Sequence, residues 1–145
     1  MTKPVHPVPA VGCVCFRGNE VLLVRRGQAP REGEWSIPGG RIEFGETAKT
    51  AVMRELTEET GVQADLIALI DVVDAIFEAE PVTDTAIHYV LIDYLARWIS
   101  GDPIAADDVT DARFVKLSQL EQFGVWDETR RIILKGYSLL QTDQA

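Results

Sequence analysis

The chain has 145 residues, of which 46% are hydrophobic and 26% are charged. This length supports one domain with a core and is too short for two ordinary ones, so residues 1–145 are expected to form a single domain. The formal net charge of −9 argues against nucleic acid or an anionic membrane surface as a partner, because both are bound through basic surfaces. An acidic protein that binds a phosphate compound would need cations between the two.

The first part of the chain predicts a strand pair and a polar loop. Residues 11–16 and 21–25 are mainly apolar, and the turn signal Arg17-Gly18-Asn19-Glu20 separates them. Cys13 and Cys15 would share one strand face, which favours buried, reduced packing residues over a disulfide or a zinc site. A polar loop follows at 27–34, and "WSIPGG" at 35–40 predicts a short apolar piece that ends at a Pro-Gly-Gly break.

The rest of the chain alternates strands, loops and helices. A helix is expected over 47–60, and Gly61 would end it in the left-handed conformation. Strands are expected over 66–77, 86–99 and 112–117, with loops at 78–85 and 100–111. Asp127 can cap a final helix that runs to about Leu140. The strand over 86–99 is apolar on both faces and so belongs in a sheet covered on both sides. The fold class is therefore α/β, a sandwich with a mixed sheet between two helices.

No segment suggests a membrane or an export signal. The N-terminus "MTKPVHPVPA" lacks the apolar run of a signal peptide, and no stretch is long and apolar enough to span a bilayer. A cytoplasmic location is therefore the expectation.

Three glutamates crowd the helix at 47–60. Glu55, Glu58 and Glu59 are spaced i, i+3 and i+4, so their carboxylates are expected to converge on one face. Hard divalent cations prefer oxygen ligands, and Mg²⁺ commonly takes one or two carboxylates together with substrate phosphates. Such a site would bridge an acidic protein and an anionic substrate. The alternative is a solvated acidic helix face, which is how most charge runs are explained.

The surroundings of these glutamates favour the metal site. Gly40 is followed after five residues by Glu46, after seven more by Arg54-Glu55-Leu56, and then by Glu58-Glu59 and Gly61-Val62. This spacing resembles the Nudix box, G-x5-E-x7-R-E-U-x-E-E-x-G-U with U an aliphatic residue, and all nine specified positions match from Gly40 to Val62. The strand pair before the box and the order of strand, loop and helix after it extend the likeness over most of the chain.

The resemblance implies hydrolysis of a nucleoside diphosphate linked to another group, with Mg²⁺ or Mn²⁺ as cofactor and a Nudix α/β/α sandwich as fold. By position, Glu55 and Glu59 match the family's principal metal ligands, Glu58 a common third ligand, and the Gly39 carbonyl a backbone ligand of several members.

Arg54 and Glu46 match the family's pair that orients the metal-binding glutamates. The bound metals would neutralise the pyrophosphate and lower the pKa of a water, from which a carboxylate takes the proton. Many members place that acid, or a further metal ligand, on a loop after the box. Asp107 and Asp108 are the candidates here, with Asp108 preferred. An alternative set is Glu78, Glu80 and Asp84. The alternative for each is a turn-forming or solvated acid.

The box defines the chemistry and leaves the substrate open. "WSIPGGRIEFGE" and "AIHYVLIDYLARW" resemble bacterial ADP-ribose pyrophosphatase-like members, so ADP-ribose or a related nucleoside diphosphate sugar is the first expectation. A mutator-type enzyme that splits nucleoside triphosphates into monophosphate and pyrophosphate is the alternative. A binding-only sensor domain is a third, although such domains usually lose box glutamates. Many diphosphate-sugar members are dimers, so a homodimer is also an expectation.

Four residues outside the box are weaker candidates for substrate contacts. Arg25 or Arg26, at the end of a strand that leads towards the box, could contact a phosphate, with surface salt bridges as the alternative. Trp35 could stack on a base, although packing beside the box is preferred. His88 is expected to be a core or pocket residue and not a metal ligand. Trp126 is expected to make a hydrophobic contact at the start of the last helix.

Overall fold

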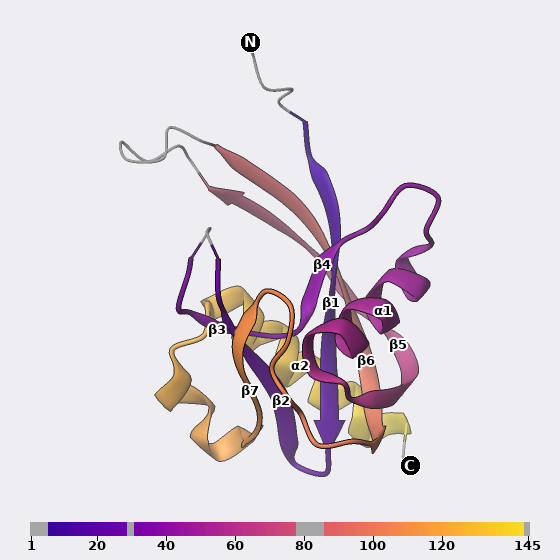
Figure 1. The fold of residues 1–145 in the computed structure, drawn as a ribbon. Coiled ribbons are helices and arrows are strands. Elements are labelled where there is room, and N and C mark those ends of the chain that lie inside the picture. Colours follow the sequence, from indigo (N-terminus) through magenta and orange to yellow (C-terminus); the bar gives the residue numbers. More distant parts are fainter. Residues whose placement is uncertain (1–5, 29–30, 78–85, 144–145) are drawn as a thin grey trace.

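A mixed sheet of seven strands forms the centre of the molecule, with one helix on each side (Figure 1). The structure is a computed structural model that describes residues 6–28, 31–77 and 86–143. The predicted α/β/α sandwich with a mixed sheet is confirmed. The strands are β1 (Val8–Arg17), β2 (Glu20–Arg26), β3 (Trp35–Ser36), β4 (Gly39–Arg41), β5 (Gln63–Phe77), β6 (Ile87–Ser100) and β7 (Val109–Lys116).

The central strand β1 changes partners along one of its edges. On one edge it pairs in parallel with β6 over its whole length. On the other edge its last residues pair with β2, whereas residues 10–12 pair with β4. The remaining pairings are antiparallel, in the order β3-β2-β1-β6-β5, with β7 beside β2. The sheet therefore divides between β2 and β4, and the cavity described below lies beside this division.

The helix α1 (Ala48–Thr60) covers one face of the sheet. Its first turn is capped by Thr47, whose hydroxyl accepts a hydrogen bond from the N–H of Thr50 at 3.1 Å. Gly61 ends the helix at φ 72°. The helix and its Gly61 terminator are thus confirmed. The helix buries Ala51, Val52 and Leu56 against apolar side chains of β1, β2 and β6.

The helix α2 (Asp127–Asp143) covers the other face and packs Ile132, Ile133 and Leu140 against it. Asp127 was expected to cap this helix, and it is instead the first helical residue. The first helical hydrogen bond runs from the N–H of Arg130 to the carbonyl of Trp126, at 2.9 Å. The Asp127 carboxylate still lies at the positive end of the helix dipole. None of the helices in the described ranges is long and apolar enough to cross a membrane.

Alternate residues of β1 serve the two cores. Val14 and Phe16 pack on the α2 side, whereas Cys13 and Cys15 pack on the α1 side and are fully buried. Both cysteines are free thiols, which confirms their predicted packing role. Burial raises the pKa of Cys15 to about 12 and raises that of Cys13 as well, because an apolar surrounding disfavours the thiolate.

The structure extends or adds several elements. β5 begins at Gln63 and β7 at Val109, each three residues before the expected start, because polar residues of these strands still pair with their neighbours. The apolar piece at 35–40 is two short strands on either side of Pro38. A 3-10 helix at Leu117–Phe123 was not predicted. The expected loop at 78–85, with Glu78, Glu80 and Asp84, lies outside the described residues.

Candidate active site

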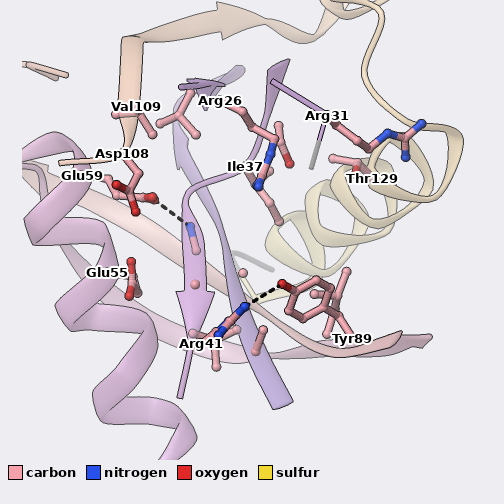
Figure 2. A pocket seen from close by; sticks show the side chains of 18 of the residues that line it. Arg26, Arg31, Ile37, Arg41, Glu55, Glu59, Tyr89, Asp108, Val109 and Thr129 are labelled. Carbon is pink, nitrogen blue, oxygen red and sulfur yellow. Dashed lines mark hydrogen bonds between the residues drawn. The ribbon is translucent and has the colours of Figure 1, made fainter. Parts of the chain in front are cut away.

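Two glutamates of α1 face a cavity of about 610 Å³. Glu59 is only 6% exposed, and its Oε1 accepts a hydrogen bond from the N–H of Gly39 at 2.9 Å. The Glu55 side chain is 12% exposed. Figure 2 shows both carboxylates projecting from the helix towards β4. The helix and the short strand after Pro38 thus place two carboxylates on one wall of the cavity.

Glu58 departs from the predicted arrangement. Its side chain is 46% exposed and accepts a hydrogen bond from Nη1 of Arg54 at 3.1 Å. It does not line the cavity within the described residues. Arg54 lies one helical turn earlier, at the i, i+4 spacing that favours such an ion pair. Three carboxylates were expected to converge on one face, but only Glu55 and Glu59 face the cavity. The hydrogen bond from Arg54 holds Glu58 on the outer side of the helix.

Arg54 forms hydrogen bonds with three glutamates of the box. Its Nε and Nη2 donate to the two carboxylate oxygens of Glu46, at 2.7 and 2.9 Å. Its Nη1 donates to Oε1 of Glu55 at 2.8 Å. The paired hydrogen bonds from Arg54 lower the pKa of Glu46 to about 2. The pair that the resemblance assigned to an orienting role is thus brought together, and through Arg54 it reaches a cavity-facing carboxylate.

Gly40 lets β4 approach this carboxylate closely. A Cβ atom at Gly40 would lie 2.6 Å from the nearest carboxylate atoms of Glu55. Such a separation is far inside van der Waals contact, so a side chain at Gly40 would push the carboxylate away. The close approach of the Glu55 carboxylate therefore explains why the first residue of the box is a glycine in this structure.

We expect Gly40→Ala to lower activity much more than stability. The atoms displaced belong to the end of a flexible side chain, so the loss of unfolding free energy should stay below about 1 kcal/mol. A shift of about 1 Å in a positioned catalytic group can cost roughly 100-fold in rate. Thermal unfolding and kcat measured on the same preparation check this. An active variant, or an inactive one that has also lost its fold, would contradict it.

The two cavity-facing glutamates have raised pKa values. Burial is the main cause for Glu59 and raises its pKa to about 8, with the charges of Glu55 and Asp107 adding to the effect. Burial also raises the pKa of Glu55, although its hydrogen bond from Arg54 opposes the shift. Desolvated carboxylates of this kind favour either a proton or a cation. This wall of the cavity therefore favours the binding of a cation.

The loop before β7 brings two more acids to the cavity. Asp107 and Asp108 both line it and are exposed, and Figure 2 labels Asp108 among the lining residues. Oδ1 of Asp108 accepts a hydrogen bond from Nε2 of Gln28 at 3.0 Å. Asp107 has φ 56°, and its charge helps to raise the pKa values of both glutamates. Both predicted candidates thus lie at the site, and Asp107 interacts with the glutamates through its charge.

The weaker candidates for substrate contacts are placed differently. Arg26 and Trp35 line the cavity. Trp35 also packs on the α2-side core, with its ring 5.2 Å from that of Phe123. Arg25 is exposed and donates to the carbonyl of Gly33 at 3.0 Å. His88 lies on β6, and the strand residues directly before and after it point to the opposite face of the sheet. Within the described ranges His88 does not line the cavity.

Other cavity residues were missed from the sequence. Nη2 of Arg41 donates to the Tyr89 hydroxyl at 3.2 Å (Figure 2). Trp126 also lines the cavity and packs on the α2-side core, with its ring 5.5 Å from that of Phe77 on β5, while its expected contact at the start of the last helix stays a prediction. Asp93 lines the cavity from β6. The available signal for Asp93 was a single acid inside the apolar run "YVLIDYLA".

The donor set fits a hard divalent cation. Within the described residues, no three acidic, histidine or cysteine side chains are grouped so as to hold a metal by themselves. Two desolvated carboxylates, Glu55 and Glu59, are nevertheless the number that Mg²⁺ commonly takes when waters and substrate phosphates complete its shell. The structure shows the N–H of Gly39 bonded to Glu59. The ligand roles of the Gly39 carbonyl and of Glu58 stay predictions.

Comparison with known proteins identifies the family of this chain. The NUDIX domain model matches residues 6–135, and the chain therefore belongs to the Nudix hydrolase family. An ADP-ribose pyrophosphatase from Methanocaldococcus jannaschii is 33% identical over 133 residues, which are 92% of this chain and 74% of that protein. An 8-oxo-dGTP diphosphatase from Escherichia coli is 36% identical over 95 residues, which are 65% of this chain and 68% of that protein.

A crystal structure shows the same fold. The MutT NUDIX hydrolase from Burkholderia pseudomallei superposes with a TM-score of 0.78 at 30% identity, over 90% of this chain and 98% of that chain. Several other curated relatives are matched over less than half of their own length. The family and its pyrophosphohydrolase chemistry are therefore shared, while the named substrates of the relatives differ.

Proposed function

We propose that this protein hydrolyses the phosphoanhydride bond of a nucleoside diphosphate sugar, with ADP-ribose as the first candidate and Mg²⁺ or Mn²⁺ as cofactor. The observation that supports this most directly is the pair of carboxylates on the wall of a cavity of about 610 Å³, the buried Glu59 and the partly buried Glu55. A cavity of this size is in the range that holds small-molecule ligands. A relative matched over 92% of this chain carries the name ADP-ribose pyrophosphatase.

The cavity lining suits such a substrate. Its α1 side is acidic, where cations would neutralise a pyrophosphate. Arg26 and Arg41 also line it and can donate to phosphate oxygens. Tyr89 and Trp126 supply aromatic surface for a base or a sugar face. One cavity thus offers groups for both the charged and the flat parts of a nucleotide.

Each residue then has a defined task. When bound, the metal lowers the pKa of a water and polarises the phosphoryl oxygens. Glu55 and Glu59 would hold that ion, and Arg54 would fix the Glu55 carboxylate through the hydrogen bond at 2.8 Å. The N–H of Gly39 holds Glu59 in place. Asp107 or Asp108 would take the proton from the attacking water.

The second candidate substrate is a nucleoside triphosphate, split into monophosphate and pyrophosphate. The Escherichia coli relative is named for that chemistry, and the acidic wall would serve it equally well. A substrate panel with product identification, run at alkaline pH with Mg²⁺ and Mn²⁺ in parallel, separates the two. AMP plus ribose 5-phosphate from ADP-ribose supports the first proposal. Pyrophosphate release from triphosphates, with no turnover of any diphosphate sugar, would replace it by the second.

Mg²⁺ should raise the melting temperature, and more so at higher pH. A ligand that binds only the folded state stabilises it by about 2.7 kcal/mol at 100 times its Kd. The cation needs ionised glutamates, and the pKa of Glu59 is about 8, so protons compete with the metal below that value. Calorimetric scans at pH 6 and pH 8.5, with and without Mg²⁺, check this. Equal shifts at the two pH values, or no shift even with a non-hydrolysable nucleotide present, would count against the site.

A further inference from the structure

One buried acid of the cavity has no task in the chemistry described above. Asp93 lies on β6, directly beside Gly12 of β1 in the parallel register. It is 4% exposed and lines the cavity. Its neighbours on the same strand face, Leu91 and Leu95, pack into the α2-side core. Asp93 is therefore a single carboxyl group within an otherwise apolar stretch of the cavity floor.

Within the described part of the chain, the Asp93 carboxyl has neither a hydrogen bond nor an ion pair. The adjacent carboxylate, Asp71 of β5, binds Lys135 at 3.2 Å and Arg131 at 3.4 Å. Burial and the charge of Asp71 raise the pKa of Asp93 to about 7. No buried side-chain nitrogen or oxygen atom of the described residues lacks a hydrogen-bond partner, so the Asp93 oxygens, which have none, are open to the cavity. An unpartnered acid that faces a cavity therefore points to a ligand.

The backbone makes room for this carboxyl. A Cβ atom at Gly12 would collide with Oδ1 of Asp93 and would lie 2.8 Å from Cδ1 of Ile37. The carboxyl thus lies against the bare backbone of β1. Ile37, Leu91 and Ala75 line the same cavity. Apolar walls with one hydrogen-bonding group match a flat heterocycle whose faces are apolar and whose edge carries N–H groups.

We propose that Asp93 reads the Watson–Crick edge of a purine base bound in this cavity. A carboxylate accepts hydrogen bonds from N1–H and N2–H of guanine, and a carboxylic acid donates to N1 of adenine while it accepts from N6–H. The proposal rests on the proposed function only in that the ligand is a nucleotide. It adds a residue that determines base specificity, at a place separate from the box glutamates.

The test measures binding and not turnover. Calorimetric Kd values for the α,β-methylene analogues of ADP, GDP and UDP, with Mg²⁺, are compared for the unmodified protein, Asp93→Asn and Asp93→Leu. Asp65→Asn is the matched control, since Asp65 is an exposed acid of the neighbouring strand β5. Asp93→Asn keeps the shape of the side chain. Asp93→Leu removes a buried polar group and should still fold, which its melting temperature verifies.

Two ratios should change. Asp93→Leu should reduce the preference for purine over uracil nucleotides at least 10-fold, because the base edge loses its partner. Asp93→Asn should move the adenine-to-guanine preference at least 10-fold towards adenine, since an amide offers one donor and one acceptor. Asp65→Asn should change neither.

Base ratios within twofold of the unmodified protein in both Asp93 variants would overturn the proposal. So would a change confined to the ratio between these analogues and their 2′-deoxy counterparts, measured in the same way, which would assign Asp93 to the sugar. Failure of the proposed function is a separate result. In that case no diphosphate sugar is turned over, while the nucleotide analogues still bind and their base ratios still respond to Asp93.

Discussion

Glu59→Gln should abolish most of the activity while it makes the metal-free protein more stable. The glutamine keeps an oxygen that can accept the hydrogen bond from Gly39, but it cannot bind a cation as a carboxylate does. We expect kcat to fall at least roughly 100-fold, because losing a group that only orients a metal ligand already costs about 10- to 100-fold and Glu59 would hold the ion itself. Glu59 is 6% exposed, so removing its charge also removes a desolvation cost.

The gain in stability should depend on pH with a defined sign. The pKa of Glu59 is about 8 in the folded protein against an ordinary value of 4.5, so the folded chain holds the proton more tightly than the unfolded chain. The unmodified protein therefore loses stability as the pH rises from about 4.5 to 8, on the order of 3 kcal/mol near pH 7. Glu59→Gln avoids this loss. The two proteins should be nearly equally stable below pH 4.5, and the gap should stop growing above pH 8.

Chemical denaturation in the presence of a chelator, at several pH values, measures this gap. Glu121→Gln is a suitable control, because that acid is 79% exposed and lies on the 3-10 helix. The control should show no comparable gap and should keep its activity. A Glu59→Gln protein that stays active would remove Glu59 from the machinery. One that is less stable than the unmodified protein at pH 8 would contradict the raised pKa.

Arg54→Ala should weaken both the fold and the catalysis. The guanidinium is bonded to Glu46, Glu55 and Glu58 at 2.7–3.1 Å, so its removal leaves these carboxylates close together without a counter-charge. Removing Arg54 from this part-buried cluster should lower the free energy of unfolding by more than the loss of an exposed ion pair does. Losing the group that orients a metal ligand typically costs 10- to 100-fold in metal affinity or activity. Unfolding curves measure the loss of stability, and metal titrations measure the loss of metal affinity separately.

Two further variants sharpen this prediction. Arg54→Lys keeps the charge but cannot make the paired bonds to Glu46, so it should recover stability better than activity. Arg130→Ala, which breaks an exposed pair with Glu121, should cost at most about 1 kcal/mol and leave activity intact. If Arg54→Ala matches the exposed control in both measurements, the cluster does not orient the site.

The sequence predicted correctly those parts of the site whose relative positions depend on a single helix. The spacing of Glu55 and Glu59 determines that both lie on one face, and no distant contact is needed to infer it. The same reasoning misplaced Glu58, because spacing does not reveal that Arg54 would hold it outside the cavity. The link from Arg54 to Glu46 came only from the family resemblance, since it joins a loop to a helix.

The part of the cavity around Asp93 could not be predicted from the sequence. Gly12 and Asp93 lie on strands far apart in the chain and become neighbours only through the parallel pairing of β1 with β6. The sequence predicted both strands without their register. The same holds for Arg41 and Tyr89, which belong to β4 and β6. Local patterns predicted the elements, whereas the contacts between them required the three-dimensional structure.

The two buried thiols can be used to measure how often helix α1 separates from the sheet. Cys13 and Cys15 are completely shielded on the α1 side of the sheet, so a thiol reagent reaches them only when the helix leaves the sheet or the chain unfolds. Their labelling rate measures how often that happens. Because α1 carries Glu55 and Glu59, a bound cation or nucleotide that fixes this helix should slow the labelling. Occupancy of the site can thus be followed by mass spectrometry without any turnover.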